Sequence, residues 1–174
     1  QPYARRALAG CGQEHLGCRA VAVLLQEVVL DLPDVVEAQL VGQFDLVEGV
    51  LEQSVLVALE AQHPRACVLP DVYHLYKGGS GLSGIRHLGA SLIGGFHLND
   101  YPDIPREDIN DSDRVHPGLG VAPLEQFFKD LWSTGYRGAL SIELFNREYW
   151  KQDPLKVAKT SLVGTKAIVK KALG

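Results

Sequence analysis

Short apolar runs recur in the second half of the chain and predict buried β-strands. They lie within residues 66–74, 92–100 and 139–145. Each run is bounded by glycine or proline and is too short to form a helix. Because proline cannot donate a hydrogen bond to a neighbouring strand, we expect the first strand to end at Pro70 and to leave Asp71 in a loop.

Apolar residues at helical spacing predict helices before, between and after these strands. We place long helices at residues 46–61, 123–134 and 154–173, and a short one at 85–90 that exposes Arg86 and His87. Pro64 limits the first long helix and Gly135 ends the second. The residues expected to face the core are Leu46, Val50, Leu51, Ser54, Val55, Ala58 and Leu59, then Leu124, Phe127, Phe128 and Leu131, then Leu155, Ala158, Leu162, Ile168 and Val169.

The pattern is less decisive near the N-terminus. Residues 20–32 are apolar and rich in valine, which is compatible with either a strand or a buried helix. Residues 35–40 form another short apolar run, which contains Glu37. Because His15, Cys11 and Cys18 match no zinc-binding spacing, we interpret residues 1–20 as loop or helix-end structure.

Strands that alternate with helices favour a parallel sheet, and such sheets carry their functional side chains at the carboxyl ends of the strands. Asp71, His97 and Glu143 lie at or near these ends. Two carboxylates and an imidazole supply the oxygen and nitrogen ligands of a divalent metal, so we predict a site for Mn, Mg, Co or Zn. Glu143 carries the most weight, because an unpaired carboxylate in an apolar strand is costly.

Composition limits the class of protein. With 174 residues, 46% hydrophobic and 22% charged, the chain is typical of one globular domain or part of one. No apolar run reaches the roughly 18 residues of a membrane span, and a net charge of −4 favours no nucleic-acid partner. Three cysteines without a CxxC motif, and no signal peptide, indicate a reducing, cytoplasmic location. Lysine is absent before Lys77 and methionine throughout, so we expect an incomplete chain.

Two polar segments are candidates for functional loops. Residues 76–84 match GxGxxG, but they do not directly follow a strand, so we favour a flexible loop over an active site rather than a phosphate cradle. Residues 99–120 form a long irregular segment of the kind that serves as a lid or binding loop. Trp132 and Trp150 are interpreted as packing residues, although Trp150 beside Tyr149 is also a candidate for a pocket wall.

Several motifs from residue 63 onward agree in order, spacing and chemistry with one family. They are His63-Pro64, Asp71-Val-Tyr-His74, Phe96-His97-Leu-Asn-Asp100, Arg114 with Pro117-Gly-Leu-Gly120, Gly135-Tyr-Arg-Gly138 and Ser141-Ile-Glu143-Leu-Phe145. These motifs resemble the sugar phosphate isomerase/epimerase family of xylose isomerase-like TIM barrels. The resemblance implies an α/β fold, a partial (β/α)8 TIM barrel of about the last three βα units. Residues 63–174 would form this C-terminal part of the barrel, and residues 1–62 a poorly matching segment that is truncated or altered.

The resemblance also implies roles for individual residues. Asp71, His97 and Glu143 would be metal ligands, while His74 and Arg114 would hold hydroxyl or carbonyl oxygens of the substrate. The family's fourth ligand is a glutamate that also transfers a proton. Its candidate in this chain is Glu37, which lies at the end of an apolar run at roughly the right distance upstream.

The implied activity is that of a metal-dependent isomerase or epimerase. Its substrate would be a sugar, keto-sugar or polyol, whose proton moves through an enediolate. Glu143 and a second carboxylate, with Glu37 as the candidate, would be the catalytic groups. Dehydration of an inosose is a close variant with the same first steps.

Two other functions stay open at this level. Residues 97–100, together with Asp113 and His116, also resemble apurinic endonucleases, which use several zinc ions and a basic DNA-binding face. The acidic balance of the chain disfavours that function, so we expect a small molecule rather than nucleic acid or a membrane as partner. The other is a non-catalytic, incomplete barrel, which a partner chain or homo-oligomerisation would complete.

Overall fold

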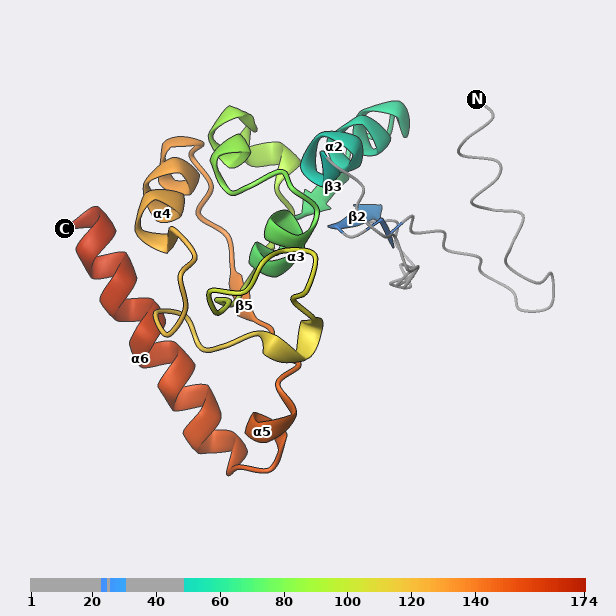
Figure 1. Ribbon diagram of the computed structural model, residues 1–174. Coiled ribbons are helices and arrows are strands. Elements are labelled where there is room, and N and C mark those ends of the chain that lie inside the picture. Colours follow the sequence, from blue (N-terminus) through green and yellow to red (C-terminus); the bar gives the residue numbers. More distant parts are fainter. Residues whose placement is uncertain (1–22, 25, 31–48) are drawn as a thin grey trace, which may run out of the picture.

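The computed structural model describes residues 23–24, 26–30 and 49–174 of the chain (Figure 1). Three βα units follow one another from residue 66 onward. β3 (Ala66–Leu69) leads to α3 (Val72–Lys77), β4 (Phe96–Leu98) to α4 (Leu124–Ser133), and β5 (Leu140–Ile142) to α5 (Arg147–Trp150) and α6 (Pro154–Leu173). The predicted alternation is confirmed, and the short helix expected at 85–90 is found as two 3-10 turns, Ser83–His87 and Ala90–Leu92.

The strands of these units run parallel and side by side. β4 pairs with β5 in parallel, with His97 opposite Ser141. Isolated parallel bridges join Val68 to Ile93 and Asp71 to His97, which places β3 on the other side of β4. The carboxyl ends of the three strands therefore meet at one edge, which is where a barrel carries its functional residues.

Two further strands precede these units. Within residues 20–32, the described residues form β1 (Val23–Leu24) and β2 (Gln26–Leu30), which pair antiparallel with each other. β2 also pairs antiparallel with β3, with Val28 opposite Val68. β2 therefore adds an antiparallel strand beside the predicted parallel ones, since an apolar run predicts a buried strand but specifies neither its direction nor its neighbour. Glu37 and the run at 35–40 lie outside the described residues.

The core forms where α2 (Val50–Glu60), α3 and α4 cover the parallel strands. The four expected core residues of α4, among them Phe127, are all buried, and the Phe127 ring lies 4.5 Å from that of Phe96 in β4. Helix α2 buries Val50, Leu51, Ser54 and Ala58, but Leu59 in its last turn is 58% exposed. Helical spacing gives the face on which a residue lies, but not how far the neighbouring element extends over that face.

Helix α6 and strand β5 are less buried than the sequence predicts. α6 packs against α4 (Figure 1), and Ile168 and Val169 contact the core, whereas Leu155 and Leu162 are at least half exposed. Trp132 and Trp150, expected to pack inside, are 51% and 64% exposed. Among the described residues, no strand pairs with the outer edge of β5, so this edge of the sheet is open. No helix in the same residues has the length and apolar character that a membrane crossing requires.

The long segment at residues 99–120 is tightly tied to its surroundings. The Asp100 carboxylate accepts hydrogen bonds from the backbone N–H groups of Tyr101, Gly118, Gly120 and Ala122. Near the middle of the segment, the Ile109 carbonyl accepts hydrogen bonds from side chains of α3, and a 3-10 turn follows at Asp111–Asp113. The segment therefore holds fixed positions against α3.

The glycine-rich segment at residues 76–84 contacts the first turns of α2. Ser80 accepts a hydrogen bond from the Leu51 N–H and donates one to the Glu52 carboxylate. A side chain at Gly78 would collide with Val50, and one at Gly84 with Leu51. These contacts explain the glycines at positions 78 and 84, and the role of the segment as a loop over an active site stays a prediction.

Candidate metal centre

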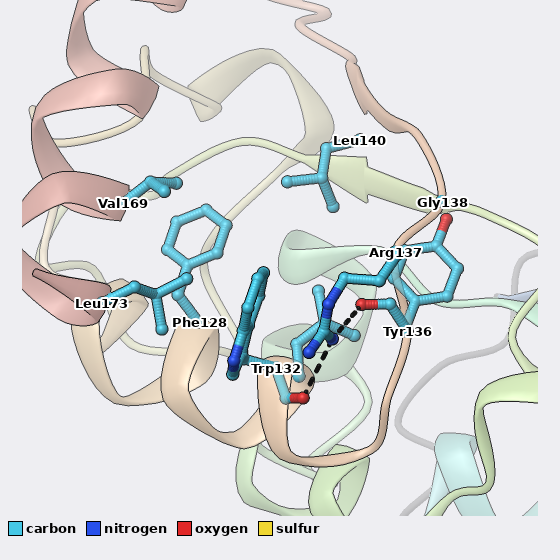
Figure 2. Close-up of a pocket in the computed structure, with 9 residues that line it drawn as sticks. Phe128, Trp132, Tyr136, Arg137, Gly138, Leu140, Val169 and Leu173 are labelled. Atoms are coloured by element: carbon cyan, nitrogen blue, oxygen red, sulfur yellow. Dashed lines mark hydrogen bonds between the residues drawn. The ribbon is translucent and has the colours of Figure 1, made fainter.

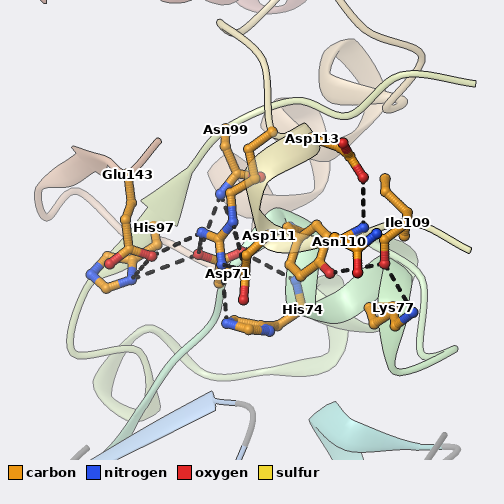
Figure 3. A network of polar contacts seen from close by, with 12 residues as sticks. Asp71, His74, Lys77, His97, Asn99, Ile109, Asn110, Asp111, Asp113 and Glu143 are labelled. Atoms are coloured by element: carbon orange, nitrogen blue, oxygen red, sulfur yellow. Dashed lines mark hydrogen bonds and ion pairs between the residues drawn. The ribbon is translucent and has the colours of Figure 1, made fainter. Parts of the chain in front are cut away.

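Asp71, His97 and Glu143 converge at the carboxyl edge of the parallel strands. Each residue offers one ligand atom, and these atoms lie within 4.8 Å of one another. His97 Nδ1 lies 3.2 Å from Glu143 Oε2 and 3.7 Å from Asp71 Oδ2. Figure 3 shows the three side chains turned toward one another. The sequence prediction required such convergence within about 5 Å, given metal–ligand distances of about 2.0–2.3 Å.

Asp71 divides its two oxygens between the backbone and the site. Oδ1 accepts hydrogen bonds from the N–H groups of Tyr73 and His74, so Asp71 caps the N-terminus of α3. Oδ2 faces His97 and Arg114. The expected loop after Pro70 is therefore corrected to a helix start, because a capping aspartate satisfies the first N–H groups of α3 at once. The cap also fixes the direction of Oδ2, which serves a ligand well.

Arg114 lies at the centre of the site with no exposed surface. Its Nη1 donates to both Asp71 Oδ2, at 2.8 Å, and Glu143 Oε2, at 2.9 Å. The guanidinium is also stacked between the rings of Tyr73 and Phe145, 4.6 and 4.8 Å from their centroids. Its predicted contact with substrate stays a prediction, since in the structure Arg114 bridges the two carboxylates.

Sequence reasoning missed two residues of this network, Asn99 and Asp111. Asn99 Nδ2 lies 3.2 and 3.3 Å from the two Asp71 oxygens, and the residue is fully buried. Asp111 Oδ1 accepts from Arg114 Nε at 3.1 Å and from Nη2 at 2.6 Å. Side chains two residues apart on a strand point to the same face, so the position of His97 could have indicated Asn99. Asp111 lies in an irregular segment, where no periodicity points to it.

The charges around Glu143 keep its carboxylate ionised. Burial opposes ionisation, but the hydrogen bond from His97 and the charges of His97 and Arg114 outweigh it and lower the pKa from 4.5 to about 2. Burial likewise opposes the charge on Arg114, and the carboxylates of Asp71 and Asp111 more than offset it, so the pKa of Arg114 is raised. Burial lowers the pKa of His74, whose Nε2 lies 3.1 Å from Arg114 Nη2.

The lowered pKa of Glu143 predicts a specific acid dependence of stability. A carboxylate with a pKa of 4.5 when unfolded and about 2 when folded contributes stability above pH 4.5, and this contribution is lost as the pH falls toward 2. In metal-free buffer we expect the difference in unfolding free energy between the wild type and Glu143→Gln to shrink over this pH range. Urea unfolding at several pH values measures it, and a difference that does not change with pH would contradict the electrostatic account.

The donor set suits a divalent cation. Carboxylate oxygens and an imidazole nitrogen are ligands of Zn, Mn and Co, and the carboxylates alone suit Mg. Asn99 and the backbone N–H at the start of α3 donate hydrogen bonds to Asp71. In metal sites, such contacts orient the residues that bind the ion. Among the described residues, this is the only group of three or more histidine, cysteine, aspartate or glutamate side chains close enough to share an ion.

Other candidate residues point elsewhere. His116 Nδ1 lies 2.6 Å from Ser161 Oγ of α6, and its ring stacks on Tyr149. The Asp113 carboxylate accepts from the Asn110 N–H and so closes the 3-10 turn. Both residues are therefore engaged in holding the fold rather than in the group around Asp71.

An apolar pocket lies at the opposite ends of the strands (Figure 2). It is lined by α4, α6 and the segment leading into β5, including Phe128, Val169 and Leu140. Leu140 begins β5, whereas Glu143 follows its end, so the pocket and the group of Asp71, His97 and Glu143 occupy different edges. Arg137 and Trp132 both line this pocket. The Arg137 guanidinium lies 3.3 Å from the centroid of the Trp132 ring and donates hydrogen bonds to two backbone carbonyls. In barrels this edge serves stability rather than chemistry.

Comparisons with known proteins agree on one family. The inosose isomerase of Halalkalibacterium halodurans is 36% identical over 101 residues, covering 58% of this chain and 36% of that protein. The inosose isomerase of Bacillus velezensis is 27% identical over 152 residues, covering 83% of this chain and 54% of that protein. Among solved structures, the IOLI protein with a bound zinc atom superposes with a TM-score of 0.65 at 26% identity, covering 71% of this chain and 44% of that one.

The chain thus spans about half the length, or less, of the relatives it matches. Together with the three βα units, this coverage confirms a partial (β/α)8 barrel, while the boundary predicted between residues 62 and 63 stays a prediction. The profile of the xylose isomerase-like TIM barrel family matches residues 43–166, well over half of the chain. The chain therefore belongs to the xylose isomerase-like TIM barrel family.

Proposed function

We propose that this chain carries the metal-binding part of an isomerase that acts on a keto-sugar or a polyol ketone such as an inosose. The convergence of Asp71, His97 and Glu143 within 4.8 Å is the observation that carries the proposal. The relatives named inosose isomerases and the zinc-bound structural neighbour support the substrate class and the divalent metal. Zn, Mn, Co and Mg remain the candidate ions.

The three ligand residues would hold the ion, which supplies Lewis-acid polarisation of the substrate carbonyl and so acidifies the neighbouring C–H bond. A carboxylate would take this proton, and the electron pair of the C–H bond would form an enediolate. The proton of the neighbouring hydroxyl would pass to the former carbonyl oxygen, and return of the first proton to the former carbonyl carbon would complete the isomerisation. Electrons and protons balance without an oxidant or reductant. Glu143, which its low pKa keeps ionised, would share this proton transfer with a second carboxylate. Glu37, outside the described residues, is our candidate.

His74 is the residue best prepared to hold a substrate oxygen. Arginine is only a donor, so the 3.1 Å contact with Arg114 assigns the acceptor role to His74 Nε2 and the proton to Nδ1. His74 Nδ1 is a buried atom with no hydrogen-bond partner within the described part of the chain. A buried donor without an acceptor lowers the stability of the fold, unless a bound ligand supplies the acceptor. The neutral ring implied by its lowered pKa is consistent with this role.

The geometry disfavours the endonuclease alternative. A site with several zinc ions needs further ligands beside the first three, and Asp113 and His116 are engaged with Asn110 and Ser161 instead. The incomplete barrel remains the second candidate, and the exposed outer edge of β5 favours it. Ile142 on this strand is 38% exposed, although the sequence predicts a buried strand. A partner chain or a second copy covering this edge would complete the barrel.

Proton exchange in heavy water tests the proposed chemistry. The chain is loaded with Co²⁺ and incubated with an inosose in D₂O, and proton NMR follows the signal of the C–H next to the carbonyl. We expect this signal to disappear faster than in samples without protein or with a chelator, because a carboxylate exchanges the abstracted proton with solvent. Exchange no faster than in the protein-free sample would contradict the proposal for this chain.

A further inference from the structure

Asp111 is a carboxylate that faces the metal centre only through Arg114. A single oxygen, Oδ1, accepts from both Arg114 Nε and Nη2, which fixes the plane of the guanidinium. The remaining nitrogen, Nη1, then points to Asp71 Oδ2 and Glu143 Oε2. Figure 3 shows Asp111 among the side chains that surround the two ligand carboxylates.

The position of Asp111 is itself set by α3 and the 3-10 turn. Tyr73 and Lys77 of α3 both donate to the Ile109 carbonyl, just before the turn. Asn110 and Asp113 then cap the turn reciprocally, so Asp111 and Arg114 lie one turn apart at its two ends. Although the Asp111 side chain is 53% exposed, its backbone is held on both sides.

Charge gives Asp111 a second effect on the centre. Arg114 donates to the same two oxygens that a metal would use, and a guanidinium without a counter-charge repels a divalent cation. With Asp111 included, three carboxylates and one guanidinium leave two negative charges, which equal the charge of one divalent ion. Without Asp111, the same ion would bring an excess of positive charge into a mostly buried site.

We propose that Asp111 is a positioning residue of the metal centre: it directs Arg114 and offsets its charge, and through Arg114 it raises the affinity of the Asp71–His97–Glu143 group for a divalent cation. This inference rests on the proposed metal-dependent function. Outer-shell partners of this kind typically change metal affinity by about 10- to 100-fold when they are replaced. Since Asp111 contacts no ligand residue directly, its effect depends on the presence of Arg114.

Titration with Co²⁺, followed by its visible absorption, tests the inference without any substrate. We expect Asp111→Asn to weaken Co²⁺ binding about tenfold and to alter the absorption band, whereas Asp108→Asn leaves both unchanged. Asp108 is exposed, carries the same charge and precedes Asp111 by three residues, so it controls for the loss of a nearby charge. A merely structural role would lower the unfolding temperature but leave the affinity of the folded chain intact.

The double variant shows whether Asp111 acts through Arg114. In an Arg114→Met background, Asp111→Asn should change Co²⁺ affinity less than about twofold, because the residue it acts through is gone. If Arg114→Met is too unstable to titrate, Arg114→Gln replaces it, because glutamine also lacks the charge but can still donate a hydrogen bond to the carboxylates. Equal Co²⁺ affinity of Asp111→Asn and wild type would overturn this inference alone. A wild-type chain that binds no Co²⁺ would overturn the proposed function and the inference together.

Discussion

Glu143→Gln should abolish stoichiometric metal binding. The amide has the same shape, but it lacks the charge that pairs with the cation and binds divalent metals far more weakly than a carboxylate. Two ligand residues, Asp71 and His97, would remain among the described residues. We expect about one equivalent of Co²⁺ or Zn²⁺ to stay with the dialysed wild type and less than about a tenth with the variant, a loss in affinity of at least the roughly 100-fold that outer-shell changes reach. Elemental analysis after dialysis measures it.

Glu148→Gln provides the matched control for this experiment. Glu148 lies on α5 five residues beyond Glu143, and its side chain is 73% exposed in an ion pair with Lys151. The substitution makes the same chemical change on an exposed side chain outside the group of Asp71, His97 and Glu143, so metal content should equal that of the wild type. Equal metal content in Glu143→Gln and wild type would show that the ion, if one binds, is held elsewhere.

The predictions that succeeded are those that depend on local pattern. Phe127 and Leu131 are buried because apolar spacing along α4 leaves no other face for the core. Asp71, His97 and Glu143 converge because parallel strands bring all their carboxyl ends to one edge, whatever lies between them in the sequence. Strand period and strand direction were therefore enough to predict that these three side chains lie together.

The predictions that failed depend on what lies beside an element. Leu155 and Leu162 lie at the spacing of a buried face, but the described residues provide nothing to cover this part of α6. The hydrophobic pattern could not predict the antiparallel pairing of β2 with β3 either, since relative direction is a property of two strands and not of one. Asp111 was missed for a related reason, because its importance comes from Arg114 and not from its own sequence context.

Arg114→Met should destabilise the metal-free chain by about 3–5 kcal/mol. Arg114 is fully buried and its positive charge bridges the carboxylates of Asp71 and Glu143, so its removal leaves these two carboxylates beside one imidazole without that charge. Methionine fills a similar volume, which makes the loss chiefly electrostatic. Urea unfolding in the presence of a chelator measures the change in unfolding free energy. A variant as stable as the wild type would show that the bridging contacts contribute nothing to the fold.

A divalent cation should restore much of this loss, because it provides positive charge at the same two oxygens. An ion that binds only the folded chain stabilises it by about 2.7 kcal/mol at 100 times its dissociation constant. We therefore expect saturating Co²⁺ to raise the unfolding free energy of Arg114→Met by about that amount. Arg147→Met is the control, because Arg147 is exposed on α5 and its loss should cost within about 0.5 kcal/mol. Stabilisation by Co²⁺ in the wild type but not in Arg114→Met would mean that Arg114 is needed to assemble the ligands rather than standing in for the ion's charge.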